Sequence, residues 1–128
     1  MIEAVFRGQF FDDPIEPRIG QIALSYDPNE QLAVTRAMDQ FRWFTGAWSV
    51  NAELPLPASF DMASRTVRDE DVSARMPCGP DLGRHVAGIR EFEAAGFTHV
   101  AVVQVGADTQ ERFITWAATE LLPTLRAS

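Results

Sequence analysis

The sequence predicts an α/β fold in which three parallel strands, at about 18–26, 72–78 and 98–105, are each followed by a helix. Segment 98–105 carries a continuous apolar run, which is typical of a strand covered on both faces. A residue able to cap a helix follows each strand segment, and apolar residues at helical spacing come next. Such alternation is typical of right-handed βαβ units, so we expect the 128 residues to form one domain with a parallel sheet.

The first predicted unit is the strand 18–26 and the helix that follows it. Asp27 can cap that helix, Pro28 suits the first helical position, and Glu30 completes a capping-box spacing. Apolar residues then fall on one helical face, and Gly46 is the expected stop.

A segment from 48 to 72 fits no simple βα unit, and we interpret it as a helical insertion at one end of the sheet. Pro55 and Pro57 interrupt it, and Pro57 favours the start of a short helix. The weaker strand 72–78 follows, with Pro77 at its end because proline cannot donate to a ladder.

The last two predicted helices flank the strand 98–105. Asp81 is expected to cap the first of them, which ends at Gly96. Asp108 with Glu111 has the spacing of a cap pair for the second, whose apolar face continues toward the C-terminus.

Composition excludes several classes of function. The net charge is −7 with dispersed acidic residues, whereas a nucleic-acid binder needs a clustered basic face. All 11 basic residues are arginine, so no lysine is available for Schiff-base chemistry. A single cysteine favours a reducing cytoplasm, and the apolar runs are far too short for a membrane span. The first residues also lack the layout of a signal peptide.

Three parallel strands leave two sheet edges unpaired, and unpaired edges are templates for association. A closed parallel barrel needs eight strands and about 250 residues. We therefore expect the chain to be a homo-oligomer or to lack the N-terminal half of a barrel.

Several short segments together resemble the luciferase-like oxidoreductases that use the deazaflavin coenzyme F420, in the branch related to F420-dependent glucose-6-phosphate dehydrogenase. The similarity extends over residues 1 to 126, and its specificity lies in the order and spacing of the motifs. These are 20–22, 41–44, 51–55, 75–81, 95–100, 104–106 and 120–125.

The resemblance implies that the chain is the C-terminal part of a (β/α)8 TIM-type barrel, with its last three βα units and with residues 1–8 as the end of a preceding helix. It implies hydride transfer between F420 and a small organic substrate, with FMN as the alternative cofactor. Most of the coenzyme pocket and the acid/base residues would lie on earlier strands, so the chain is expected to be inactive alone. The alternatives are a non-catalytic assembly module that pairs with another chain, and a segment of a flavin-dependent monooxygenase.

Two residues are candidate substrate contacts. Arg75 matches an arginine that holds the substrate's phosphate in the resembling branch, and its guanidinium suits an anion; the alternative is a surface ion pair with Glu70 or Asp71. Gln104 is placed near the C-terminal end of a strand, where barrel active sites lie; it would bond either a ligand or the neighbouring loop. The absence of lysine, which the resembling enzymes use to hold a sugar phosphate, argues against that substrate.

The other reactive residues are interpreted as structural, and no catalytic or metal-binding residue is assigned. Cys78 precedes a helix but has no histidine close in sequence, so we expect a buried filler. His85 and His99 are isolated and do not form a metal site. Ser25 and Tyr26 end the first strand and are weaker ligand candidates, and the aromatic residues 41–44 are expected in the core.

Overall fold

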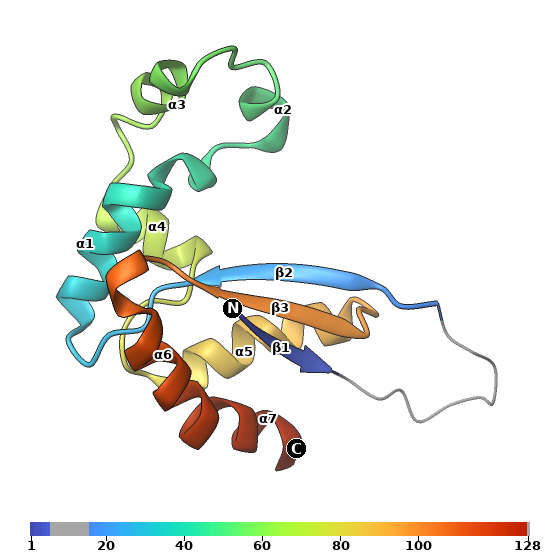
Figure 1. Cartoon of the computed structure of the whole chain (residues 1–128). Helices are drawn as coiled ribbons and strands as arrows, with labels where there is room; N and C mark the ends of the chain where they lie inside the picture. The colour runs from blue at the N-terminus through green and yellow to red at the C-terminus, as the bar shows by residue number, and fades with distance from the viewer. Residues whose placement is uncertain (6–15, 128) are drawn as a thin grey trace.

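A computed structural model describes residues 1–5 and 16–127 of the chain. A three-stranded sheet with the order β1-β3-β2 lies over helices on one face, and a group of short helices projects from one end (Figure 1). None of the helices in this part of the chain is long and apolar enough to span a membrane.

The two strands with the clearest sequence signals form as predicted and run parallel. β2 (Ile19–Leu24) and β3 (His99–Gln104) pair directly, from Ile19 opposite His99 to Leu24 opposite Gln104. Side chains on one face, among them Leu24, Val100 and Val102, are buried, whereas Ile19 on the other face is 68% exposed. Helices therefore cover one face of this pair, and the opposite face is largely open (Figure 1).

The start of the chain differs from the prediction. Residues 1–8 were expected to end a helix, but Ile2–Val5 form strand β1, which pairs antiparallel with β3; residues 6–8 lie outside the described part. This strand pairs with an edge of β3 that we expected to be unpaired. Pairing with a strand about a hundred residues away decides the structure here, and a local pattern cannot reveal such a partner.

The predicted strand 72–78 is wrong, because most of it lies in helix α4 (Asp69–Arg75). Three acidic residues occupy the first turn, where the helix dipole favours negative charge, and the Asp71 carboxylate accepts a hydrogen bond from the Arg68 N–H. Val72 and Met76 are both buried beside α1 (Glu30–Phe41), whereas Ala74 between them is exposed, which fits a helix and not an alternating strand. Only a single parallel bridge, between Ser25 and Cys78, remains of the expected strand.

Two of the helix caps lie one or two residues after their predicted positions. The cap of α1 is Asn29, which accepts a hydrogen bond from the Leu32 N–H. Asp27 binds two arginine side chains instead. Asp108 lies inside a short 3-10 turn, η2 (Ala107–Thr109), so α6 (Gln110–Trp116) begins after Thr109. The third cap is confirmed: Asp81 accepts from the Gly83 N–H at the start of α5 (Leu82–Ala94).

The insertion is helical, as predicted, and begins where α1 ends. It contains the turn η1 (Arg42–Thr45), α2 (Trp48–Asn51) and α3 (Pro57–Ala63), and α4 then returns the chain to the body. Gly46 ends η1 and not the first long helix. At the far end of the chain, η3 (Ala117–Leu121) and α7 (Leu122–Ala127) continue the line of α6.

Two apolar clusters hold the body together. One lies between the sheet and α5 and α6, with Leu24, Ile89, Val102 and Phe113 fully buried. The other lies between α1 and α4 at the ends of the parallel strands and includes Val72. The insertion therefore projects from the second cluster and not from the sheet.

Candidate functional site

The carboxyl ends of β2 and β3 meet at one edge of the sheet, where parallel-barrel enzymes place their sites. Gln104 ends β3 and is 3% exposed. Its amide accepts from the Tyr26 N–H (2.9 Å) and donates to the Tyr26 carbonyl (3.0 Å) and to Thr109 Oγ1 (3.0 Å). Both functional atoms of the Gln104 amide are thus bonded within the chain, to the neighbouring loop.

A buried carboxylate lies beside this junction. Asp27 is placed by the turn after β2, accepts the Asn29 N–H, and binds Arg36 at 2.8 Å and Arg112 at 3.2 Å. Burial alone would raise the pKa of Asp27, but the hydrogen bonds from Asn29 and Arg36 and the nearby charges of Arg36 and Arg112 hold it below its ordinary value. Asp27 is therefore ionised, and the three side chains carry one net positive charge at the strand ends.

Gly106 allows the chain to turn beneath this cluster. Its φ of +97° is in the region that favours glycine, and a Cβ there would lie 2.5 Å from the Arg36 side chain. A side chain at position 106 would therefore displace the arginine that holds Asp27.

An aromatic group with a buried histidine backs the same edge. Tyr26 stacks on Trp116 with ring centres 4.0 Å apart, and His85 meets Trp116 edge-on at 5.2 Å. Nε2 of His85 donates to the Gly79 carbonyl at 2.8 Å, whereas Nδ1 is buried without a hydrogen-bond partner among the described residues. Burial lowers the pKa of His85, so the neutral ring is the form that the fold accommodates.

The other predicted reactive groups lie where the sequence placed them. Cys78 is fully buried, and burial raises the pKa of its thiol to about 11, which leaves it protonated at neutral pH. His99 is the first residue of β3, at the end opposite the candidate site, and contacts Thr98 Oγ1. Ser25 donates its hydroxyl hydrogen to the Ala33 carbonyl inside the body.

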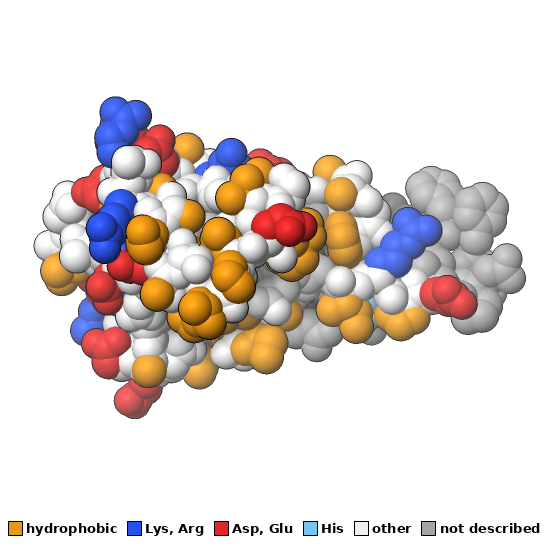
Figure 2. Space-filling model, turned by 90° about the horizontal axis from the view of Figure 1, so that it is seen from above, with side chains coloured by type: hydrophobic (Ala, Val, Ile, Leu, Met, Phe, Trp, Pro, Cys, Tyr) orange, Lys and Arg blue, Asp and Glu red, His pale blue; other side chains and the backbone are white. Residues whose placement is uncertain are grey.

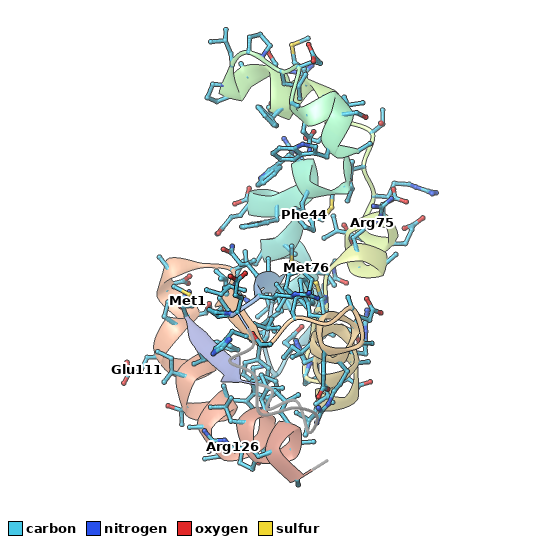
Figure 3. All side chains as sticks on the ribbon, turned by 90° about the vertical axis from the view of Figure 1, so that its right-hand side faces the viewer. Met1, Phe44, Arg75, Met76, Glu111 and Arg126 are labelled. Atoms are coloured by element: carbon cyan, nitrogen blue, oxygen red, sulfur yellow. The ribbon has the colours of Figure 1, made fainter. Side chains whose placement is uncertain are left out.

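Arg75 lies apart from the strand ends, at the junction between the insertion and the body, close to Phe44 and Met76 (Figure 3). Its guanidinium makes no hydrogen bond or ion pair with any residue that the structure describes. The predicted alternative partners, Glu70 and Asp71, both bind Arg68 instead. Arg75 is thus a cation that residues 1–5 and 16–127 do not neutralise.

A pocket of about 320 Å³ opens beside Arg75. One wall is the outer edge of β2, the edge opposite β3, and another is α5. Arg84 also lines the pocket and is held by Glu30 (3.2 Å) and by the Ser73 carbonyl (3.1 Å), and Glu91 lines it further along α5. The pocket therefore contains one paired arginine, one unpaired arginine and one carboxylate, an arrangement that suits a small anion.

Sequence reasoning missed the Asp27, Arg36 and Arg112 cluster and the part played by Arg84. Asp27 was assigned to a helix cap, and nothing in the local pattern connects it with Arg112, which lies 85 positions away. The only available signal was the position of Asp27 directly after a predicted parallel strand.

Comparison with known proteins shows similarity to F420-dependent enzymes in both sequence and fold. The chain is 30% identical over 97% of its length to an F420-dependent glucose-6-phosphate dehydrogenase from Intrasporangium calvum. Its fold is similar to that of an F420-dependent secondary alcohol dehydrogenase in complex with an F420-acetone adduct, with a TM-score of 0.63, 17% identity and 85% of this chain covered.

The chain spans about a third of either protein, 36% of the relative and 32% of the structural neighbour. No protein-family profile matches it. The resemblance stated from the motifs is nevertheless confirmed by both comparisons: the chain is similar to part of the F420-dependent oxidoreductases of the luciferase-like type.

Proposed function

We propose that the chain is the C-terminal segment of an F420-dependent oxidoreductase that transfers hydride between the coenzyme and a small organic substrate. The observation that carries this proposal is the 30% identity to an F420-dependent dehydrogenase over nearly the whole chain. Within such an enzyme the coenzyme supplies the redox chemistry, and the protein binds and orients the substrate.

We propose that the described residues contribute to a coenzyme pocket without completing it. At the strand ends Gln104 is bonded to Tyr26, and Asp27 is bonded to two arginines, which leaves few polar atoms free for a ligand. We therefore propose that residues 1–128 form a single partial-barrel domain that is inactive until further strands, from another polypeptide or a second copy, complete it. The expected setting is a reducing cytoplasm, because Cys78 is the only cysteine.

Arg75 is the proposed substrate contact. Gln104 supports the proposed site by joining the ends of the two strands. Support for Arg75 comes from its unpaired guanidinium beside a pocket that also contains Arg84. A phosphate or carboxylate would be bound there by charge-assisted hydrogen bonds. Since the chain has no lysine, we expect a smaller anion than a sugar phosphate to bind best.

The experiment is a chimera in which this chain replaces the matching segment of the Intrasporangium calvum enzyme. We expect the chimera to reduce F420, whereas the purified chain alone gives no turnover with F420 or FMN. A chimera that folds and binds F420 but never turns over would favour the non-catalytic module, and turnover by the chain alone would refute the partial-barrel proposal.

Arg75 is tested separately on the full chain, with inorganic phosphate as the probe and calorimetry as the measurement. Arg75→Ala should weaken phosphate binding about tenfold, in line with the loss of one charge-assisted contact, and change stability by less than about 0.5 kcal/mol. Arg65→Ala, an exposed arginine of the same segment, is the matched control. A large loss of stability with unchanged phosphate binding would show that Arg75 has a structural role.

A further inference from the structure

The insertion formed by η1, α2 and α3 carries large apolar side chains but has no core of its own. None of the residues in these three elements is buried. Trp48 is 81% exposed, and Leu56 is 62% exposed. Seen from above, hydrophobic side chains gather on this side of the molecule, where α2 and α3 lie (Figure 2).

These side chains surround a hollow of about 510 Å³, which is larger than the pocket beside Arg75. A hollow of this volume lies within the range of small-molecule sites, about 300–1,000 Å³, which are typically apolar with a few polar groups. None of the described residues that line it is charged. Its walls are Trp43, Trp48, Asn51, Pro55, Leu56, Pro57 and Phe60.

Two of the aromatic walls, Trp43 and Phe60, are held in place by contacts with each other and with neighbouring residues. Trp43 and Phe60 meet edge to face, with ring centres 6.0 Å apart at 87°. The Trp43 indole N–H donates to the Gln40 carbonyl at 3.1 Å, and the Asn51 amide donates to the Trp43 carbonyl at 3.2 Å. Arg42 at the base of the insertion pairs with Asp61 of α3. The ring faces are thus fixed while the polar groups behind them are already bonded.

We propose that this hollow is a binding site for an uncharged molecule of one or two fused rings. Aromatic walls in edge-to-face contact favour another ring, which can stack on or meet them edge-on. A charged ligand would lose its hydration without gaining an ion pair. The site is separate from the Arg75 pocket, and it goes beyond the oxidoreductase proposal because it requires neither F420 nor further strands.

A small molecule is the occupant because the surface is concave. A broad surface of a second copy would leave the volume of the hollow unfilled, whereas a small ring system would fill it. The fixed positions of Trp43 and Phe60 also favour a preformed site, since a preformed pocket binds a ligand without the cost of ordering.

The test uses two fluorescent probes that share a ring system, neutral N-phenylnaphthylamine and its anionic counterpart anilinonaphthalene sulfonate, titrated into the full chain. We expect one site that binds the neutral probe at least about tenfold more tightly than the anionic one. Trp48→Ala should weaken neutral-probe binding about tenfold, and Leu56→Ala should weaken it severalfold. Both side chains are exposed, so neither change should unfold the chain.

The matched controls are Leu32→Ala and Ile114→Ala, which remove exposed apolar side chains outside the hollow and should leave binding unchanged. Equal binding of the neutral probe by Trp48→Ala and the unaltered chain would overturn the proposal. Tighter binding of the anionic probe would also overturn it. Probe binding that weakens as the chain is concentrated would show that a second copy fills the hollow instead. None of these results depends on activity of the chimera, so the two proposals can fail independently.

Discussion

Replacement of Gln104 by leucine separates a structural role of this residue from a ligand-binding one. The change keeps the approximate volume and removes an amide that bonds both the N–H and the C=O of Tyr26 and also Thr109. The Tyr26 carbonyl keeps a longer bond from Arg36, at 3.4 Å, whereas its N–H loses its described partner. A donor that is buried away from water without a partner destabilises the fold by about 1–3 kcal/mol. Because Tyr26 is half-buried, we expect the free energy of unfolding to fall by about 2 kcal/mol.

Urea denaturation of Gln104→Leu against the unaltered chain measures this loss. A destabilisation of about 2 kcal/mol corresponds to a fall in Tm of roughly 5–10 °C for a chain of this length. Gln40→Leu, at an exposed position of α1, is the control and should stay within about 0.5 kcal/mol. An equally small effect of Gln104→Leu would refute the structural reasoning and return Gln104 to the set of free ligand contacts.

Three further changes follow from the buried groups. Stability should fall as pH drops below about 6.5, because His85 has a lowered pKa in the fold and protonates first in the unfolded chain; His85→Phe should flatten this slope, and an unchanged slope would contradict the assignment. Gly106→Ala should cost at least about 1–3 kcal/mol, since φ is positive and Arg36 fills the space; full stability in thermal unfolding would contradict the reported conformation. The Cys78 thiol should react with a disulfide reagent far more slowly in the native chain than in urea, and equal rates would show that Cys78 is accessible.

Local patterns predicted the parts of the fold that depend on local physics. The apolar run at 98–105 identified β3, and Asp81 marked the start of α5. Segment 72–78 was assigned to a weaker strand with Pro77 at its end. The acidic first turn favours a helix, and the exposure of Ala74 between the buried Val72 and Met76 does not fit the alternation of a strand.

Distant pairing decided the rest of the fold and the site. Strand β1 exists because it pairs with β3, and the Asp27 cluster exists because α6 brings Arg112 back to the turn after β2. Gln104 was assigned to the correct end of its strand, but its partner Tyr26 is 78 positions away. Arg75 was selected through a family resemblance. It forms no ion pair with Glu70 or Asp71 because both bind Arg68, and sequence spacing alone does not show which arginine they bind.

The antiparallel strand β1 bears on how the chain could complete a barrel. In a closed parallel barrel both neighbours of a strand run in its own direction. In this chain β3 has the parallel β2 on one side and the antiparallel β1 on the other, with Ile2 opposite Val102. Completion on that side therefore requires β1 to leave β3 and give up a four-residue ladder. The outer edge of β2 lies beside the Arg75 pocket. An added strand that pairs there would form a further wall of that pocket, so strand addition at this edge and anion binding by Arg75 should be coupled.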